Sequence, residues 1–74
     1  MKIDHLITMA NQIGDFFKSY PDHEQAKKDI VTHIKRFWAQ GMRHQIIAHV
    51  NEHAGEGLDP IVGEAIRQHS AILS

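Results

Sequence analysis

The stretch HIKRFWAQGMRHQIIAHV, from His33 to Val50, holds the only tryptophan of this 74-residue chain. It also carries three of the eight Lys and Arg residues and three of the seven histidines. On both sides of its middle segment, apolar residues recur at steps of three and four, which is the spacing of an amphipathic helix. The stretch therefore predicts two helices that meet at a corner. Gly41 is the expected end of the first, because glycine readily takes the left-handed turn that closes a helix.

The same spacing continues outward from this corner in both directions. A first and a fourth helix are expected, with Asp4, Asp22 and Asp59 as the N-caps of the first, second and fourth. Pro21 closes the first helix, and Pro60 suits the first position of the fourth. The expected apolar faces are Leu6, Met9, Ala10, Ile13, Phe16, Phe17 and Tyr20; Ala26, Ile30, Ile34, Phe37 and Trp38; Met42, Ile46, Ile47 and Val50; and Ile61, Val62, Ala65, Ile66, Ile72 and Leu73.

No alternating strand pattern and no internal repeat appears, so the prediction is an all-α fold. We expect one domain over residues 1–74, a small bundle of about four short helices. Gly14 lies inside the first helix, where glycine costs about 1 kcal/mol relative to alanine. Either that cost is tolerated or another backbone comes close there. The basic residues expected on the solvent side of the second helix are Lys27, Lys28, Lys35 and Arg36.

Charge and composition exclude several classes of function. Eight basic and nine acidic residues leave no positive excess for binding nucleic acid. No apolar run approaches the ~20 residues of a membrane span, and the N-terminus lacks the apolar core of a signal peptide, so we expect a cytoplasmic protein. Cysteine is absent, which leaves no disulfide and no thiolate-bound metal. A chain this short buries only about 60% of its unfolded surface, which makes a stabilising partner chain a strong candidate.

Metal binding and catalysis find weak support. His49 and His53 are four residues apart on one helix and close enough to share a metal ion. A third ligand would have to come from another helix, and no zinc motif is present. Catalysis needs a nucleophile, a base within reach and a pocket that excludes water, and four short helices can hardly enclose a substrate. We therefore assign no catalytic, cofactor-binding or metal-ligating residue.

The corner itself is the candidate site. Its aromatic residues either fill the small core, with the neighbouring basic residues solvated, or stand exposed where the two helices meet. Tryptophan, other aromatic residues and arginine are the types that dominate hot spots in protein–protein interfaces. With three basic residues in an acidic chain, single-stranded nucleic acid is a weaker interpretation than a protein partner. The predicted partner-binding residues are Arg36, Phe37, Trp38, Met42 and Arg43.

Four segments, taken in order, are similar to one known family. They are MANQIGDFF (Met9–Phe17), HIKRFW (His33–Trp38), MRHQIIAHV (Met42–Val50) and GEGLDPIVGEAI (Gly55–Ile66). Together they resemble the delta subunit of NAD-dependent, molybdenum-containing formate dehydrogenases. Each segment is a weak signal alone, whereas four in series over nearly the whole chain are specific.

The resemblance implies a non-catalytic accessory subunit of a cytoplasmic enzyme, which supports assembly, cofactor insertion or stability of the complex through protein–protein contacts. It implies the large formate dehydrogenase subunits as partners. The molybdenum cofactor, iron–sulfur clusters, FMN and NAD would be held by those subunits and none by this chain. An alternative stays open, a self-associating helical module that binds an unrelated partner or a histidine-bound metal. A homo-oligomer of the isolated chain is compatible with either interpretation.

Overall fold

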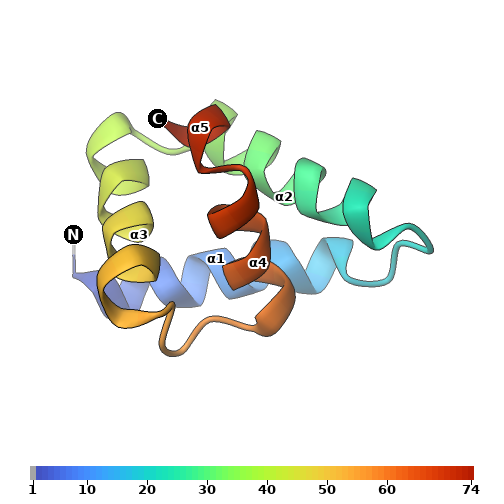
Figure 1. The fold of residues 1–74 in the computed structure, drawn as a ribbon, viewed down its shortest axis with the longest axis horizontal. Coiled ribbons are helices and arrows are strands. Elements are labelled where there is room, and N and C mark those ends of the chain that lie inside the picture. The colour runs from blue at the N-terminus through green and yellow to red at the C-terminus, as the bar shows by residue number, and fades with distance from the viewer. Residues whose placement is uncertain (1) are drawn as a thin grey trace.

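The structure, a computed structural model, describes residues 2–74, and all of its regular elements over that range are helices (Figure 1). The predicted all-α fold is therefore confirmed. A short fifth helix follows a break at His69, where the sequence pattern indicated one continuous fourth helix. Within the described range, no helix combines the length and apolar character needed to cross a membrane. The helices are α1 (Ile3–Phe17), α2 (His23–Phe37), α3 (Gln40–His53), α4 (Pro60–Gln68) and α5 (Ser70–Leu73).

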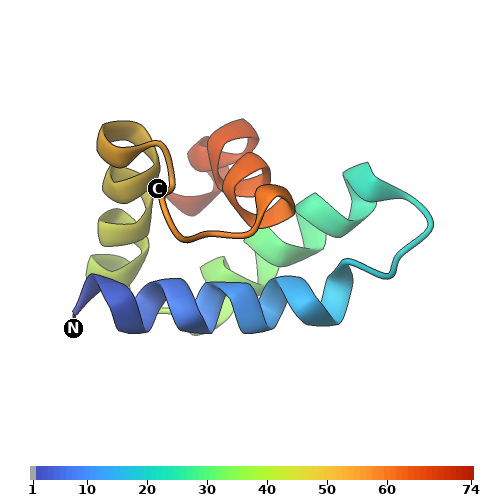
Figure 2. The same cartoon turned by 90° about the horizontal axis from the view of Figure 1, so that it is seen from below.

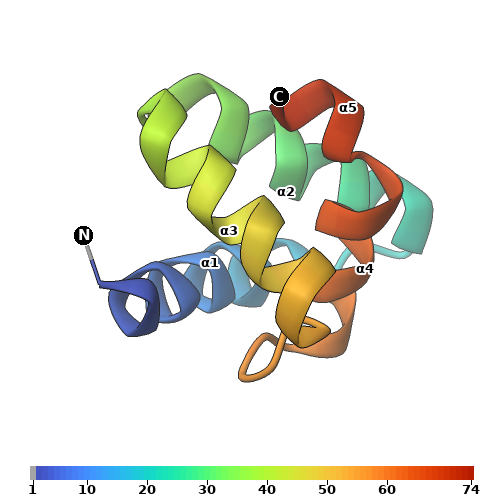
Figure 3. The same ribbon diagram turned by 60° about the vertical axis from the view of Figure 1, so that its left-hand side comes forward.

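The helix α4 lies at the centre of the arrangement and contacts each of the other four helices. Figure 2 shows α1 running along one side of the molecule, with α3 standing near its N-terminal end. The helix α2 packs against both α1 and α4. The short α5 then returns the chain to α2 and α3, and it lies above α4 in Figure 3. The two helices that form the corner, α2 and α3, thus each pack against α1, α4 and α5.

Two of the three predicted N-caps are confirmed in position. The carboxylate of Asp22 accepts hydrogen bonds from the second and third backbone N–H groups of α2, at 3.0 and 3.2 Å. Such a cap satisfies donors that have no partner inside the helix. Asp59 precedes Pro60 at the start of α4, although its side chain makes no capping bond.

Several other predicted boundaries are wrong, and α1 ends at Phe17 rather than just before Pro21. The helix α1 starts one residue before Asp4, whose negative charge lies in the first turn and still favours the positive end of the helix. Gly41 does not end α2, because it lies in the first turn of α3. The corner is made instead by Trp38 and Ala39, both with extended backbone. Two extended residues redirect the chain here without a left-handed glycine.

The core collects buried side chains from all five helices. Along α1 the buried stripe follows steps of four, so that Phe16 falls beside it and is 72% exposed. Along α2 the buried stripe ends on Trp38, and the neighbouring Phe37 is 68% exposed. Phe16, Phe37 and Ile72 (44% exposed) were placed on the apolar faces of their helices, and this placement is wrong for all three. For Phe37, the alternative of an exposed position at the corner is the correct one. The core cluster is Leu6, Ala10, Ile30, Val31, Ile34, Trp38, Ile46, Val50, Val62, Ala65, Ile66 and Leu73.

Asn11 of α1 forms two hydrogen bonds to the loop between α3 and α4. Its side-chain N–H group donates to the carbonyl oxygen of Gly57 at 3.0 Å. Its side-chain oxygen accepts from the backbone N–H of Asp59 at 2.9 Å. The loop reaches this position through positive φ angles at Ala54, Gly55 and Gly57, and it passes close to α1 in Figure 2. One amide thereby sets where α4 begins relative to α1.

Gly14 is buried where α4 meets α1. A Cβ atom at this position would clash with the Cγ2 atom of Val62. The close approach that the sequence suggested is therefore real, but the neighbour is a side chain of α4 rather than a backbone. Gly63 differs, because a Cβ atom there would meet no atom within 4 Å. Of these two helical glycines, only Gly14 is required by packing.

Lys27 is buried, contrary to its expected place on the solvent side of α2, with 6% of its side chain exposed. Its ammonium group lies 3.1 Å from a carboxylate oxygen of Glu64 on α4 and 3.1 Å from one of Glu24 on α2. The aliphatic part of a lysine can cover apolar surface while the charge reaches a polar rim. Hydrogen bonds to Glu64, and then to Glu24, raise the pKa of Lys27 above its usual value.

The two glycines provide a first test of this packing. We expect Gly14→Ala to lower the free energy of unfolding by about 1–3 kcal/mol, since overpacking outweighs the gain in helix propensity. Gly63→Ala is the matched control and should raise it by up to about 1 kcal/mol. Urea unfolding followed by far-UV circular dichroism measures both changes. Similar values for the two variants would contradict the assigned contact between Gly14 and Val62.

A second prediction concerns pH. Folding raises the pKa of Lys27, so its contribution to stability is complete below the unfolded-state pKa near 10.5 and is lost as the pH rises through the higher folded-state pKa. The melting temperature should therefore fall as the pH exceeds about 10.5. The fall should be smaller in Lys27→Met and unchanged in Lys28→Met, whose lysine is exposed on the same helix. Identical pH profiles of the melting temperature for the two variants would show that Lys27 is not the cause of this fall in stability.

Candidate partner-binding surface

The structure separates the five residues predicted to form a partner-binding surface. Trp38 is 6% exposed and belongs to the core, as the apolar face of the second helix predicted and contrary to the alternative of an exposed position at the corner. Met42 and Arg43 are half-buried, and Met42 packs against the core. Only Arg36 and Phe37 are exposed. A binding role of the five residues stays a prediction, but only two of them are accessible to another protein over most of their side chain.

Arg43 is engaged inside the molecule. Its Nε donates to the carbonyl oxygen of Leu73 at 2.9 Å, and its Nη1 donates to that of Trp38 at 2.9 Å. A longer contact of 3.4 Å joins Nη1 to the carbonyl oxygen of Lys35. These carbonyl groups lie at the C-terminal ends of α2 and α5, where oxygens lack partners within the helix and attract positive charge. Arg43 therefore connects α3 to the ends of two other helices.

An accessible apolar surface does exist beside the corner, between α1 and α2. A hollow of about 420 Å³ lies there, which we call the aromatic groove. Phe16 of α1 and Phe37 of α2 are its exposed members, and the other lining side chains are half-buried. The groove is lined by Ile13, Phe16, Phe17, His33 and Phe37.

The rings of the aromatic groove contact one another in series. Phe16 and Phe17 meet edge to face with centroids 5.0 Å apart, and Phe17 lies 6.4 Å from His33. The His33 and Phe37 rings follow at 4.7 Å. The guanidinium of Arg36 lies 5.7 Å from the centroid of the Phe37 ring, within the range of a cation–π contact. Such contacts favour fixed ring orientations, which lowers the entropy cost of binding a partner.

Sequence reasoning found one wall of this groove and missed the other. Phe37 and Arg36 were predicted, whereas Phe16 was assigned to the core. The only local signal was the four-residue spacing of Leu6, Ala10 and Gly14, and the mixed spacing of the other apolar residues of α1 competes with it. A buried stripe with that spacing leaves Phe16 to one side, since residues two positions apart do not share a helix face.

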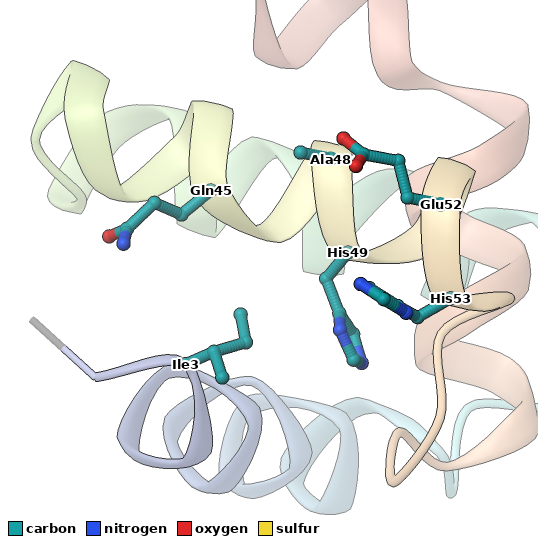
Figure 4. Close-up of a pocket in the computed structure, with 6 residues that line it drawn as sticks. All are labelled: Ile3, Gln45, Ala48, His49, Glu52 and His53. Carbon is teal, nitrogen blue, oxygen red and sulfur yellow. The ribbon is translucent and has the colours of Figure 1, made fainter.

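A second hollow lies between α3 and the start of α1, and Figure 4 shows the His49 and His53 rings side by side in it. Their centroids are 5.7 Å apart. The Nε2 atom of His49 lies 2.6 Å from the carbonyl oxygen of Glu56, so this nitrogen is already in contact with the loop. Over residues 2–74, no three His, Asp or Glu side chains are grouped so that they could hold a metal ion. The histidine pair therefore lacks the third protein ligand that a metal site needs.

The helical fold and the aromatic groove define a small helical protein with an exposed, preordered apolar surface. Over residues 5–66 the chain matches the family described as NADH-dependent formate dehydrogenase delta subunit FdsD. Because the match covers most of the 74 residues, the chain belongs to this family, and the resemblance of the four sequence segments is confirmed. No significant match was found among curated proteins or among solved structures.

The neighbouring aromatics Trp38 and Phe37 should respond in opposite ways to truncation. Trp38→Ala should lower the free energy of unfolding by about 3–5 kcal/mol, which is a large part of the stability of a small domain. Phe37→Ala should change it by less than about 0.5 kcal/mol, because its ring is mostly in water. Thermal and urea unfolding measure both. A stable Trp38→Ala variant, or an unfolded Phe37→Ala variant, would contradict the placement of these rings.

Proposed function

We propose that this chain is a non-catalytic accessory subunit of a cytoplasmic NAD-dependent formate dehydrogenase. It supports assembly, cofactor insertion or stability of the complex through protein–protein contacts with the large subunits. Membership of the delta subunit family supports the link to the enzyme. In this proposal the large subunits hold the molybdenum cofactor, the iron–sulfur clusters, FMN and NAD.

The observation that carries the contact role is the exposure of Phe16 and Phe37 on adjacent helices. Burying one such side chain is worth about 1.5–3 kcal/mol relative to leaving it in water. Within residues 2–74, only one other large apolar side chain, Ile72, is exposed, and its exposed fraction of 44% is lower than that of either ring. Exposed apolar side chains that gather in one place mark sites of interaction, whereas scattered ones need no explanation.

The proposed contact residues therefore differ from those that the sequence suggested. Phe37 and Arg36 remain, and Phe16 joins them from α1. Trp38 and Arg43 act indirectly, since one fills the core behind the corner and the other holds the helix ends around it. Changing either would disturb the surface through the fold rather than through a lost contact.

Affinity purification tests the proposal. The tagged chain, isolated from cells that produce it naturally, should recover formate dehydrogenase subunits. The double variant Phe16→Ser/Phe37→Ser should recover at least tenfold less, because it removes the central apolar contacts. Ile72→Ser is the matched control, since it changes an exposed apolar residue on α5, and it should leave recovery unchanged.

A loss of the chain should also lower the amount of assembled enzyme, measured as its molybdenum content and as formate-dependent reduction of NAD in cell extracts. Failure of the unmodified chain to recover any formate dehydrogenase polypeptide would overturn the proposal. Equal recovery by the double variant and the unmodified chain would overturn the role of the aromatic groove while leaving the link to the enzyme intact.

A further inference from the structure

The aromatic groove has features that define what kind of segment it accepts. We propose that it receives one amphipathic helix of another formate dehydrogenase subunit. An apolar side chain of that helix inserts between Phe16 and Phe37, and a carboxylate of the same helix pairs with Arg36. The inference rests on the proposed function and adds the structural element and the chemistry of the partner.

The walls of the groove determine the shape of its occupant. Both walls are helices, and residues 2–74 contain no strand whose free edge could pair with an extended peptide. Recognition by strand addition needs such an edge, whereas an amphipathic helix lays its apolar face into a groove and needs no free strand. A groove between two packed helices accepts side chains spaced three and four residues apart on a third helix. Side-chain packing, and not backbone pairing, therefore selects the partner.

Arg36 determines the charge of the occupant. It is exposed at the rim, and its guanidinium is held near the Phe37 ring at 5.7 Å from the centroid. Among the residues that the structure describes, the ion pairs involve Lys18 and Lys27, and Arg36 has no acidic partner. A guanidinium beside a ring offers a planar set of donors that matches a carboxylate in geometry and charge. An Asp or Glu next to the apolar anchor complements this rim.

A second copy of the chain does not provide this occupant. Over residues 2–74, its exposed large apolar side chains are Phe16, Phe37 and Ile72. The first two already form the groove, and Ile72 lies alone on a four-residue helix. Within residues 2–74, no helix therefore carries two exposed large apolar side chains at steps of three or four. We therefore assign the occupant to a different polypeptide.

Photocrosslinking in the intact complex identifies the occupant. The probe is p-benzoylphenylalanine, placed at Phe16 or at Phe37, where an exposed ring already stands. Both positions should crosslink to one segment of another formate dehydrogenase subunit, with apolar residues at steps of three and four and an adjacent Asp or Glu. The same probe at Glu52, exposed on α3, is the control and should not reach that segment. Crosslinks only to a second copy, to a segment without this pattern, or to nothing would overturn the inference.

Charge reversal tests the role of Arg36. Arg36→Glu should weaken binding to the crosslinked subunit at least tenfold, and an Asp or Glu changed to Arg in the crosslinked segment should restore it. Arg67→Glu is the matched control, because both arginines are exposed in the last turn of a helix, and it should change affinity by less than about twofold. Circular dichroism verifies that each variant is folded.

These outcomes separate the two proposals. If the unmodified chain recovers formate dehydrogenase but Arg36→Glu binds as well as Arg67→Glu, the inferred carboxylate contact is wrong and the accessory role stands. If the unmodified chain recovers none of the enzyme, the accessory role itself is wrong, and the inference about its partner fails with it.

Discussion

The burial of one indole ring at the corner between α2 and α3 is the constraint on which the rest of the structure depends. Trp38 turns the chain with an extended backbone, sends its ring into the core and offers its carbonyl oxygen to Arg43. The same arginine reaches Leu73, so the end of the chain's last helix is tied to the corner as well. Trp38 thereby couples the direction of the chain to the filling of the core. Through Arg43, it is also linked to the position of α5.

The small size of the core explains why large rings lie outside it. Small residues on the buried stripe of α1, Ala10 and Gly14, let α4 approach until Val62 contacts the helix directly. Among the buried residues of the core cluster, Trp38 supplies the one aromatic ring. Phe16 and Phe37 fall beside the buried stripes and meet the half-buried rings between them. The aromatic groove is thus a consequence of close helix packing as well as a candidate binding surface.

Helix content, helix order and most of the core follow from the sequence, because a spacing of three and four residues and the residues Asp22 and Pro60 are local signals. The side on which Phe16 or Lys27 lies could not be predicted in the same way. A mixed spacing of three and four residues is compatible with a narrow buried stripe and with a wide one that includes Phe16. Only the contact with α4 selects the narrow stripe. Only one wall of the candidate site could be predicted from local signals. Arg36 and Phe37 are neighbours in sequence, whereas the opposite wall comes from a helix whose rotation local signals do not determine.

The clamp that Asn11 makes on Gly57 and Asp59 has a consequence for the way the chain folds. Its two hydrogen bonds join residues 46 and 48 positions apart, and Gly14 likewise finds its contact in Val62. The hairpin of α1 and α2 alone leaves this part of α1 uncovered, so its native packing waits for nearly the whole chain to emerge from the ribosome. Contacts that close such long loops cost more conformational entropy than the local contacts within a helix or hairpin. The face of α1 that carries Asn11 and Gly14 therefore becomes packed only after α4 has docked.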